Sequence, residues 1–139
     1  MDGLHLMAEL YDCTCDLRLL TDAPALHTLC LGVCSRPGLT PVGCVFHQFG
    51  SPEAPAGATG AVVLAESHLA VHTWPEIRAV TLDLYVCNFS QDNSAAARLA
   101  YQDLIAAFAG RRLAERELER GLRAPRGDED LRCCGELPR

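Results

Sequence analysis

The densest group of chemically useful side chains lies between Glu66 and Glu76. The segment contains the only tryptophan of the chain and two of its five histidines, and it reads Glu66-Ser67-His68-Leu69-Ala70-Val71-His72-Thr73-Trp74-Pro75-Glu76. A serine hydroxyl is a potential nucleophile and an imidazole a potential base. The alternation in residues 67–73 predicts a strand with Ser67 on one face and with His68 and His72 on the other. Taken alone, the pattern is more typical of the solvent face of an amphipathic strand.

A serine in this position has a specific reaction available to it. When the preceding turn is strained, the Ser67 hydroxyl can attack the carbonyl carbon of Glu66 and convert the amide into an ester. A base that removes the α-proton of Ser67 then expels Glu66 as a carboxylate. The dehydroalanine that remains loses ammonia and becomes a pyruvoyl group, whose ketone can form a Schiff base with a substrate amine and accept electrons during decarboxylation.

The basic residues exclude one kind of carbonyl chemistry. All twelve are arginine, and the chain contains no lysine. Neither pyridoxal phosphate nor a substrate can therefore be held as a lysine Schiff base. If the chain performs carbonyl chemistry, the carbonyl group must come from another source.

Composition limits the classes of function and location. With 139 residues, 49% of them hydrophobic, the chain can bury one core. The net charge of −6 makes nucleic acid an unfavourable partner. We expect no membrane segment and a cytoplasmic protein, because no basic leader or long apolar stretch is present. The eight cysteines lack the spacing of zinc ligands, so we expect reduced thiols and no metal site.

Periodicity predicts the elements that must position these residues. Alternation predicts strands over residues 3–13, 40–49, 61–65, 67–73 and 79–89. Capping residues and helical spacing predict a helix from Asp22 to about residue 36 and another from Ser94 to Gly110. The Pro- and Gly-rich segment 50–60 predicts a loop, and propensity leaves segment 112–122 undecided between helix and strand.

This order of elements predicts an α+β fold. We expect a two-layer α/β sandwich, with a mainly antiparallel sheet and two helices on one face. One domain should span residues 1–122, and the polar segment 123–139 should be a disordered tail.

The motif at residues 66–76 resembles the self-cleavage motif of the prokaryotic S-adenosylmethionine decarboxylase proenzymes. The similarity extends to the segments 3–6, 9–13, 46–49, 83–87 and 116–121. It covers the chain from residue 3 to about residue 121. The resemblance implies cleavage between Glu66 and Ser67 into a small chain, 1–66, and a large chain, 67–139, with a pyruvoyl group made from Ser67.

The resemblance also implies roles for individual residues. His72 corresponds to the base of processing, and Thr59 to a hydroxyl residue that assists it. Cys87 corresponds to the general acid of the mature enzyme. In the substrate site, Glu76 is expected to hold ribose hydroxyls and Phe49 to lie near an adenine, and Trp74 either lines the pocket or belongs to the core.

At the level of assembly and pathway, the resemblance implies a homodimer of processed protomers whose sheets face each other, and a role in spermidine synthesis. The chain departs from the family pattern at residues 77–79, at Asn88 and in the longer loop 50–59, and we expect these positions to lie near the pocket. They keep open the alternative of a pyruvoyl enzyme that acts on ornithine or arginine. A non-enzymatic, unprocessed homologue is disfavoured, because Ser67, His72 and Cys87 are all present.

Overall fold

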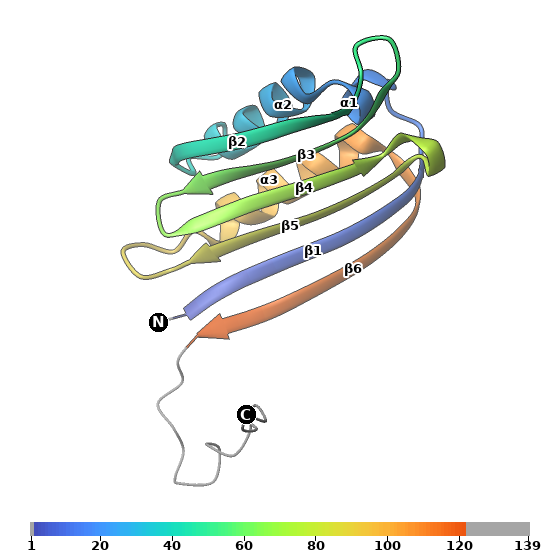
Figure 1. Cartoon of the computed structure of the whole chain (residues 1–139). Helices are drawn as coiled ribbons and strands as arrows, with labels where there is room; N and C mark the ends of the chain where they lie inside the picture. Colours follow the sequence, from blue (N-terminus) through green and yellow to red (C-terminus); the bar gives the residue numbers. More distant parts are fainter. Residues whose placement is uncertain (1, 122–139) are drawn as a thin grey trace, which may run out of the picture.

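The computed structural model describes residues 2–121, which form one twisted sheet with all of their helices on one face (Figure 1). The elements are β1 (Asp2–Cys13), α1 (Arg18–Thr21), α2 (Ala23–Ser35), β2 (Pro41–Gly50), β3 (Pro55–Leu64), β4 (Ser67–Trp74), the 3₁₀ helix η1 (Pro75–Ile77), β5 (Ala79–Cys87), α3 (Ser94–Phe108) and β6 (Gly110–Gly121). The predicted α+β sandwich is confirmed. The short helix α1 was not predicted, and the predicted tail lies outside the described residues.

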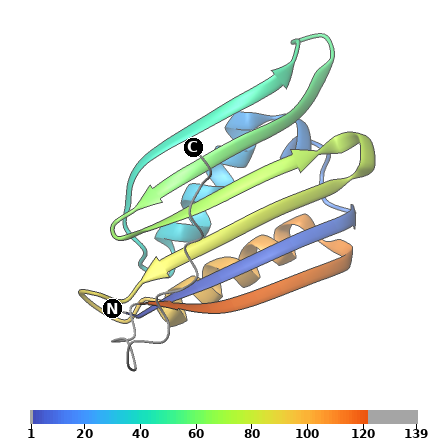
Figure 2. The ribbon, with the colours of Figure 1, turned by 60° about the horizontal axis from the view of Figure 1, so that its bottom comes forward.

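The sheet has six strands in the order β2-β3-β4-β5-β1-β6, and all neighbours are antiparallel. Its second face carries no helix within residues 2–121, as the turned view shows (Figure 2). We call this the outer face. None of the helices in the described range is long and apolar enough to cross a membrane.

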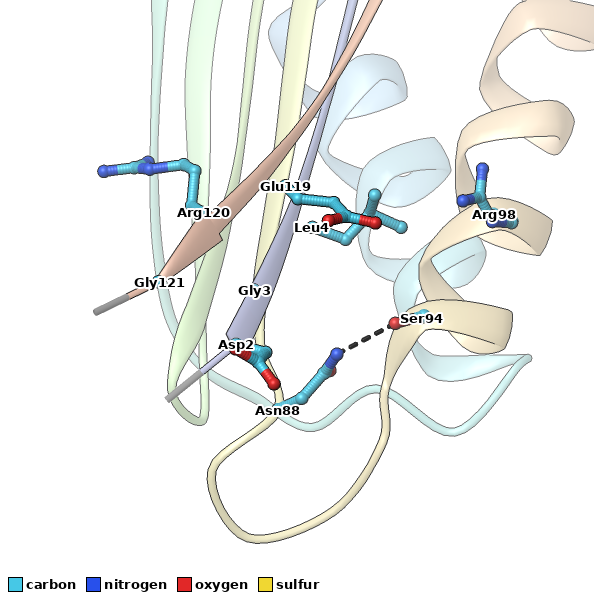
Figure 3. A pocket seen from close by; sticks show the side chains of 9 residues that line it. All are labelled: Asp2, Gly3, Leu4, Asn88, Ser94, Arg98, Glu119, Arg120 and Gly121. Atoms are coloured by element: carbon cyan, nitrogen blue, oxygen red, sulfur yellow. Dashed lines mark hydrogen bonds between the residues drawn. The ribbon is translucent and has the colours of Figure 1, made fainter. Parts of the chain in front are cut away.

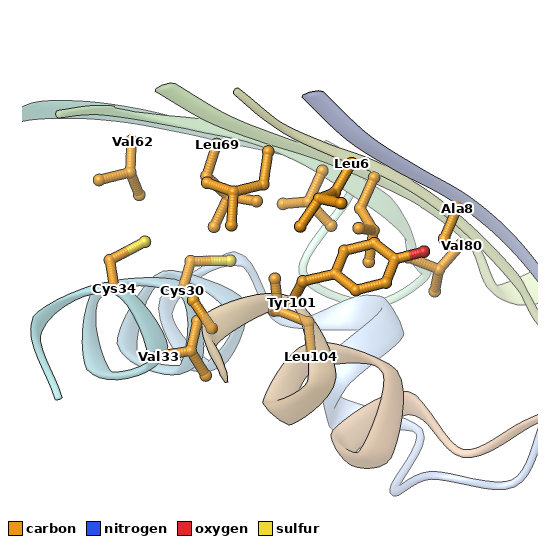
Figure 4. Packing of buried hydrophobic residues seen from close by; sticks show 14 of the residues in the cluster. Leu6, Ala8, Cys30, Val33, Cys34, Val62, Leu69, Val80, Tyr101 and Leu104 are labelled. Carbon is orange, nitrogen blue, oxygen red and sulfur yellow. The ribbon is translucent and has the colours of Figure 1, made fainter. Parts of the chain in front are cut away.

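Alternation along the strands separates the core from the outer face. Every second residue of the central strands packs under α2 and α3, including Leu6, Ala8, Val62, Leu69 and Val80 (Figure 4). Cys30 and Cys34 of α2 are fully buried in this layer. Burial raises the pKa of Cys30 to about 12 and that of Cys34 to about 11, so both remain neutral thiols at physiological pH.

The helix ends follow the capping residues of the sequence. Asp22 caps α2 by accepting a hydrogen bond from Ala25 N–H (3.1 Å), and this bond, followed by that from Arg18, lowers the pKa of Asp22. The α3 helix begins at Ser94, whose N–H donates to Asp92 Oδ1 (2.9 Å). Both predicted helices are therefore confirmed close to their expected ends.

Two segments differ from the expectation. The predicted loop 50–60 is wrong over its second half, because β3 begins at Pro55 and only residues 51–54 form the turn. Glycine content there reflects close packing, since the Phe46 ring occupies the space above Gly60 that a side chain would need. The undecided segment 112–122 is a strand up to Gly121, because pairing with β1 overrides its helical propensity.

The side chain of Thr73 connects the sheet to the helical layer. Its buried hydroxyl accepts from Ala58 N–H (2.8 Å) in β3 and donates to Leu20 O (2.7 Å) in α1. One side chain thus joins β4, β3 and the start of the helical segment. A buried N–H left without such a partner carries a desolvation penalty.

We predict that Thr73→Val lowers the free energy of unfolding by about 1–3 kcal/mol, because Ala58 N–H and Leu20 O lose their partner. The measurement is urea unfolding at equal protein concentration, in a Ser67→Ala background that keeps the chain uncut. Thr81→Val makes the same change at a half-buried position on the outer face and should cost less than about 0.5 kcal/mol. Equal losses in both variants would contradict the role assigned to Thr73.

Candidate active site

Ser67 follows a strained two-residue turn. Leu64 of β3 pairs with Ser67 of β4, so only Ala65 and Glu66 connect the strands. Glu66 has a φ of +64°, a left-handed conformation that costs energy in a residue other than glycine. Its carboxylate accepts hydrogen bonds from the N–H (3.3 Å) and the hydroxyl (3.2 Å) of Ser90, which help to hold the turn in place.

Cys87 lies directly beside Ser67. Its backbone N–H donates to Ser67 Oγ (3.2 Å), and its carbonyl accepts from Asn93 Nδ2 (3.1 Å). Cys87 ends β5 and is only 7% exposed. We refer to Glu66, Ser67 and Cys87 as the serine end of the site.

The other predicted residues gather at the opposite end of β4. A cavity of about 420 Å³ is lined by Phe49, Thr59, His72, Trp74 and Glu76, together with residues 56–58 and Thr73. His72 Nδ1 lies 2.7 Å from Thr59 Oγ1, so the two residues predicted for processing are hydrogen bonded. Trp74 is 38% exposed and therefore lines the cavity and is not part of the core. We call these five residues the histidine end.

Tight packing of β3 shapes this cavity. A side chain at Gly57 would collide with the carbonyl of Thr73, so only glycine lets the backbone of β3 approach the end of β4 so closely. Gln48 of β2 holds the same stretch, because its Nε2 donates to the carbonyls of Ala56 and Gly57 (both 3.1 Å). Its Oε1 accepts from Ala23 N–H (2.8 Å) at the start of α2. The cavity wall is thereby fixed to the helical layer.

The structure does not bring the two ends together within one chain. Ser67 and His72 are five residues apart on the continuous strand β4, which corresponds to about 16 Å at the rise of an extended chain. They also point to opposite faces of the sheet, as the alternation predicted. A proton transfer requires a contact of about 3 Å, so His72 cannot act on Ser67 of its own chain in this conformation.

A further group of polar residues around His68 was missed by sequence reasoning. Asp83 Oδ2 lies 3.2 Å from His5 Nε2 and 3.5 Å from His68 Nε2. The ring of Tyr85 is 5.8 Å from that of His5 and 5.7 Å from that of His68, measured between centroids. We call these four residues the His68 cluster. Each occupies an outer-face position of its strand, a pattern visible in the sequence, but only the pairing of β1, β4 and β5 joins them.

Two of the departures from the family pattern have structural roles away from the cavity at the histidine end. Asn88 Nδ2 donates to Ser94 Oγ (2.9 Å), and its Oδ1 accepts from Asn93 N–H (2.9 Å), so Asn88 builds the loop before α3 (Figure 3). Arg78 donates to the carbonyls of Cys13 and Cys15 (2.6 and 2.9 Å) and fixes the end of β1. Neither residue lines the cavity at the histidine end, but Asn88 directly follows Cys87 of the serine end. Residues 56–59 of the third departure line that cavity.

A larger cavity, of about 690 Å³, lies beside Asn88 between the sheet and α3, and residues such as Asp2, Arg98 and Arg120 line it (Figure 3). It contains none of the predicted site residues. Within residues 2–121, no group of three or more histidine, cysteine or acidic side chains is arranged to hold a metal ion.

Comparison with known proteins gives a consistent result. The family model described as S-adenosylmethionine decarboxylase matches residues 4–121. The S-adenosylmethionine decarboxylase proenzyme of Pelotomaculum thermopropionicum is 32% identical over 86% of this chain and 87% of its own length, and that of Picrophilus torridus is 37% identical over 86% and 84%. The crystal structure of the adenosylmethionine decarboxylase from Aquifex aeolicus superposes with a TM-score of 0.75 at 30% identity, covering 91% of this chain and 97% of that one. The chain belongs to the S-adenosylmethionine decarboxylase family.

Proposed function

We propose that this chain is a self-processing, pyruvoyl-dependent decarboxylase that acts on S-adenosylmethionine in polyamine biosynthesis. Cleavage between Glu66 and Ser67 would give chains 1–66 and 67–139. The observation that carries the proposal is the placement of Ser67, directly after a left-handed residue and beside Cys87. Membership of the family supports the reaction, and the relatives named above are all decarboxylase proenzymes of this substrate.

The geometry of the turn supports self-cleavage. The strain at Glu66 is released when the peptide bond before Ser67 is broken, so it favours attack by the Ser67 hydroxyl. In this attack Oγ bonds to the Glu66 carbonyl carbon as the C–N bond breaks. Removal of the Ser67 α-proton then breaks the Cβ–Oγ bond, and Glu66 departs with that oxygen as a carboxylate. Water replaces the nitrogen, which leaves as ammonia.

The residues around Ser67 fit the group that this reaction would create. A pyruvoyl ketone supplies the electron sink that a lysine-bound cofactor supplies in other decarboxylases. No lysine is available here, and Cys87 is held against the position of Ser67 by its own backbone N–H. Cys87 is thus positioned to return a proton to the substrate α-carbon as a general acid. Its burial keeps bulk water away from that step.

The histidine end fits the nucleoside part of S-adenosylmethionine. Phe49 and Trp74 offer aromatic faces for an adenine and for the sulfonium cation, and the Glu76 carboxylate can accept from ribose hydroxyls. Ornithine and arginine contain no aromatic base that could stack on these aromatic side chains. The cavity therefore favours S-adenosylmethionine over the two basic amino acids.

A complete site requires a second copy of the chain. The serine end and the histidine end lie about 16 Å apart along β4. Within residues 2–121 no helix covers the outer face, which bears exposed apolar side chains such as Val45, 75% exposed, and Leu118. A two-fold axis through this face would bring the serine end of one protomer to the histidine end of the other. We propose a homodimer with two such composite sites.

We predict that the purified protein consists of two chains, with the larger one lighter than residues 67–139 by one ammonia. After reduction with cyanoborohydride in a mixture of S-adenosylmethionine, ornithine and arginine, the larger chain should carry one adduct derived from S-adenosylmethionine. Intact denatured mass spectrometry measures both results, and Ser67→Ala should remain a single chain without adduct. A wild-type protein that stays uncut would refute the enzyme assignment.

The composite site predicts complementation between two inactive variants. Ser67→Ala and His72→Ala should each remain uncut when expressed alone. When the two are co-expressed with different tags, the His72→Ala chain should be cut, because His72 of the second copy can reach its Ser67. Gel analysis of each tagged chain measures the result. Cleavage of His72→Ala alone, or none in the mixed dimer, would contradict the shared site.

The only tryptophan of the chain provides a reporter of substrate binding. We expect S-adenosylmethionine to change the Trp74 fluorescence of uncut Ser67→Ala protein in a saturable way, whereas ornithine and arginine should leave it unchanged. Glu76→Gln should weaken this binding on the order of tenfold, since a charged acceptor is lost. Similar responses to all three compounds would argue against the assigned substrate.

A further inference from the structure

Self-cleavage, if it proceeds as proposed, removes the groups that hold residue 67 in place. Ser67 Oγ, which accepts the hydrogen bond from Cys87 N–H, leaves with Glu66, and the backbone nitrogen of Ser67 leaves as ammonia. The covalent link to β3 through Ala65 and Glu66 is lost as well. Strand termini without such anchors fray readily. The reactive group must nevertheless stay beside Cys87 for decarboxylation.

The next residue, His68, is held by contacts that cleavage does not touch. Its Nε2 lies 3.5 Å from Asp83 Oδ2, and its ring packs against Tyr85 at 5.7 Å and His5 at 6.4 Å between centroids. His68 is the first side chain of β4 that projects from the outer face. All of its partners belong to β5 and β1, which remain paired with each other after cleavage.

The partners of His68 are themselves fixed. His5 Nε2 lies 3.2 Å from the same oxygen of Asp83, which leaves the carboxylate little freedom to turn away. The Tyr85 ring lies against Gly3, where a side chain would approach it to 2.8 Å. The guanidinium of Arg120 covers the Tyr85 ring at 4.3 Å from its centroid. These contacts restrict the side chains of Asp83 and Tyr85, which in turn hold the His68 imidazole in one position.

We propose that His68, held by Asp83, His5 and Tyr85, is a positioning residue that keeps the newly formed end of β4 docked beside Cys87. The inference rests on the proposed self-cleavage. The anchor matters only after the Glu66-Ser67 bond is broken, because the intact turn holds residue 67 until then. In the proposed dimer the nucleoside would bind in the cavity at the histidine end of the partner, and neither His68 nor its contacts line that cavity. Loss of the anchor should therefore affect turnover and leave substrate affinity nearly unchanged.

The test compares His68→Ala and Asp83→Asn with wild type in the dimeric protein. Both variants should be cut into two chains. Their kcat should fall on the order of 10- to 100-fold, as expected when a reacting group is displaced by about 1 Å, with KM changed less than about threefold. His68→Gln, whose amide can still donate to Asp83, should recover most of the activity. The control is His27→Ala, which removes a half-buried imidazole of α2 that contacts Cys44 and Phe46, away from both ends.

A readout independent of activity comes from hydrogen exchange of the segment 68–71. Exchange should be faster in cut His68→Ala than in cut wild type, and the two should be equal in an uncut Ser67→Ala background. Because His68→Ala and Asp83→Asn should act through one contact, their effects on kcat should be much less than multiplicative in the double variant.

Several outcomes would overturn the inference. If both variants had the kcat and the hydrogen exchange rates of wild type, His68 would not be an anchor, and the proposed decarboxylase function would be unaffected. A folded but uncut His68→Ala chain would place the residue in the cleavage step instead, and a rise in KM with unchanged kcat would place it in substrate binding. If His68→Ala does not fold, the kcat of Asp83→Asn and the hydrogen exchange of its segment 68–71 test the inference instead. Failure of the wild-type chain to split at all would instead refute the proposed function.

Discussion

The register of β4 between β3 and β5 is the constraint on which both ends of the site depend. Pairing of Ser67 opposite Val86 places its hydroxyl next to Cys87 N–H, and pairing of Thr59 opposite His72 makes their 2.7 Å contact. A slip by one residue would turn His72 toward the helices and expose core residues to solvent. The hydrophobic face of β4, packed under α2 and α3, therefore also sets the geometry of the chemistry.

The turn before Ser67 combines stability of the sheet with local strain. A two-residue connection leaves Glu66 in a left-handed conformation, which persists because the flanking strands are paired on both sides and Ser90 helps to hold the carboxylate. Cleavage would relax this strain without loss of the core. The same event would remove the groups that hold residue 67, so the contacts of His68 gain importance only in the cut protein. A chain without lysine cannot hold pyridoxal phosphate as a Schiff base, so it lacks that alternative carbonyl partner for a substrate amine.

Most of the fold could be predicted because alternation and capping are local signals. Asp22 and the segment after Asp92 mark the helix starts, and the apolar alternation of β1, β4 and β5 marks the buried strands. The prediction was wrong at residues 55–60, where glycines serve close packing against Phe46 and Thr73, and a composition rule cannot distinguish this use from a loop. The charged strand β6 also gave no clear signal, since an edge strand is determined by the partner it pairs with.

The sequence by itself determined that a serine, two histidines and two carboxylates lie in one short segment of a chain that lacks lysine, and the resemblance of that segment to a known motif indicated their chemistry. It also determined which face of β4 each residue occupies, since alternation is a property of the extended backbone. Only the tertiary structure decided that His72 lies too far from Ser67 to act within one chain, and that His5 and Asp83 hold His68. Those relations depend on the straightness of a whole strand and on the pairing of strands that are distant in sequence, and no local pattern encodes either of them.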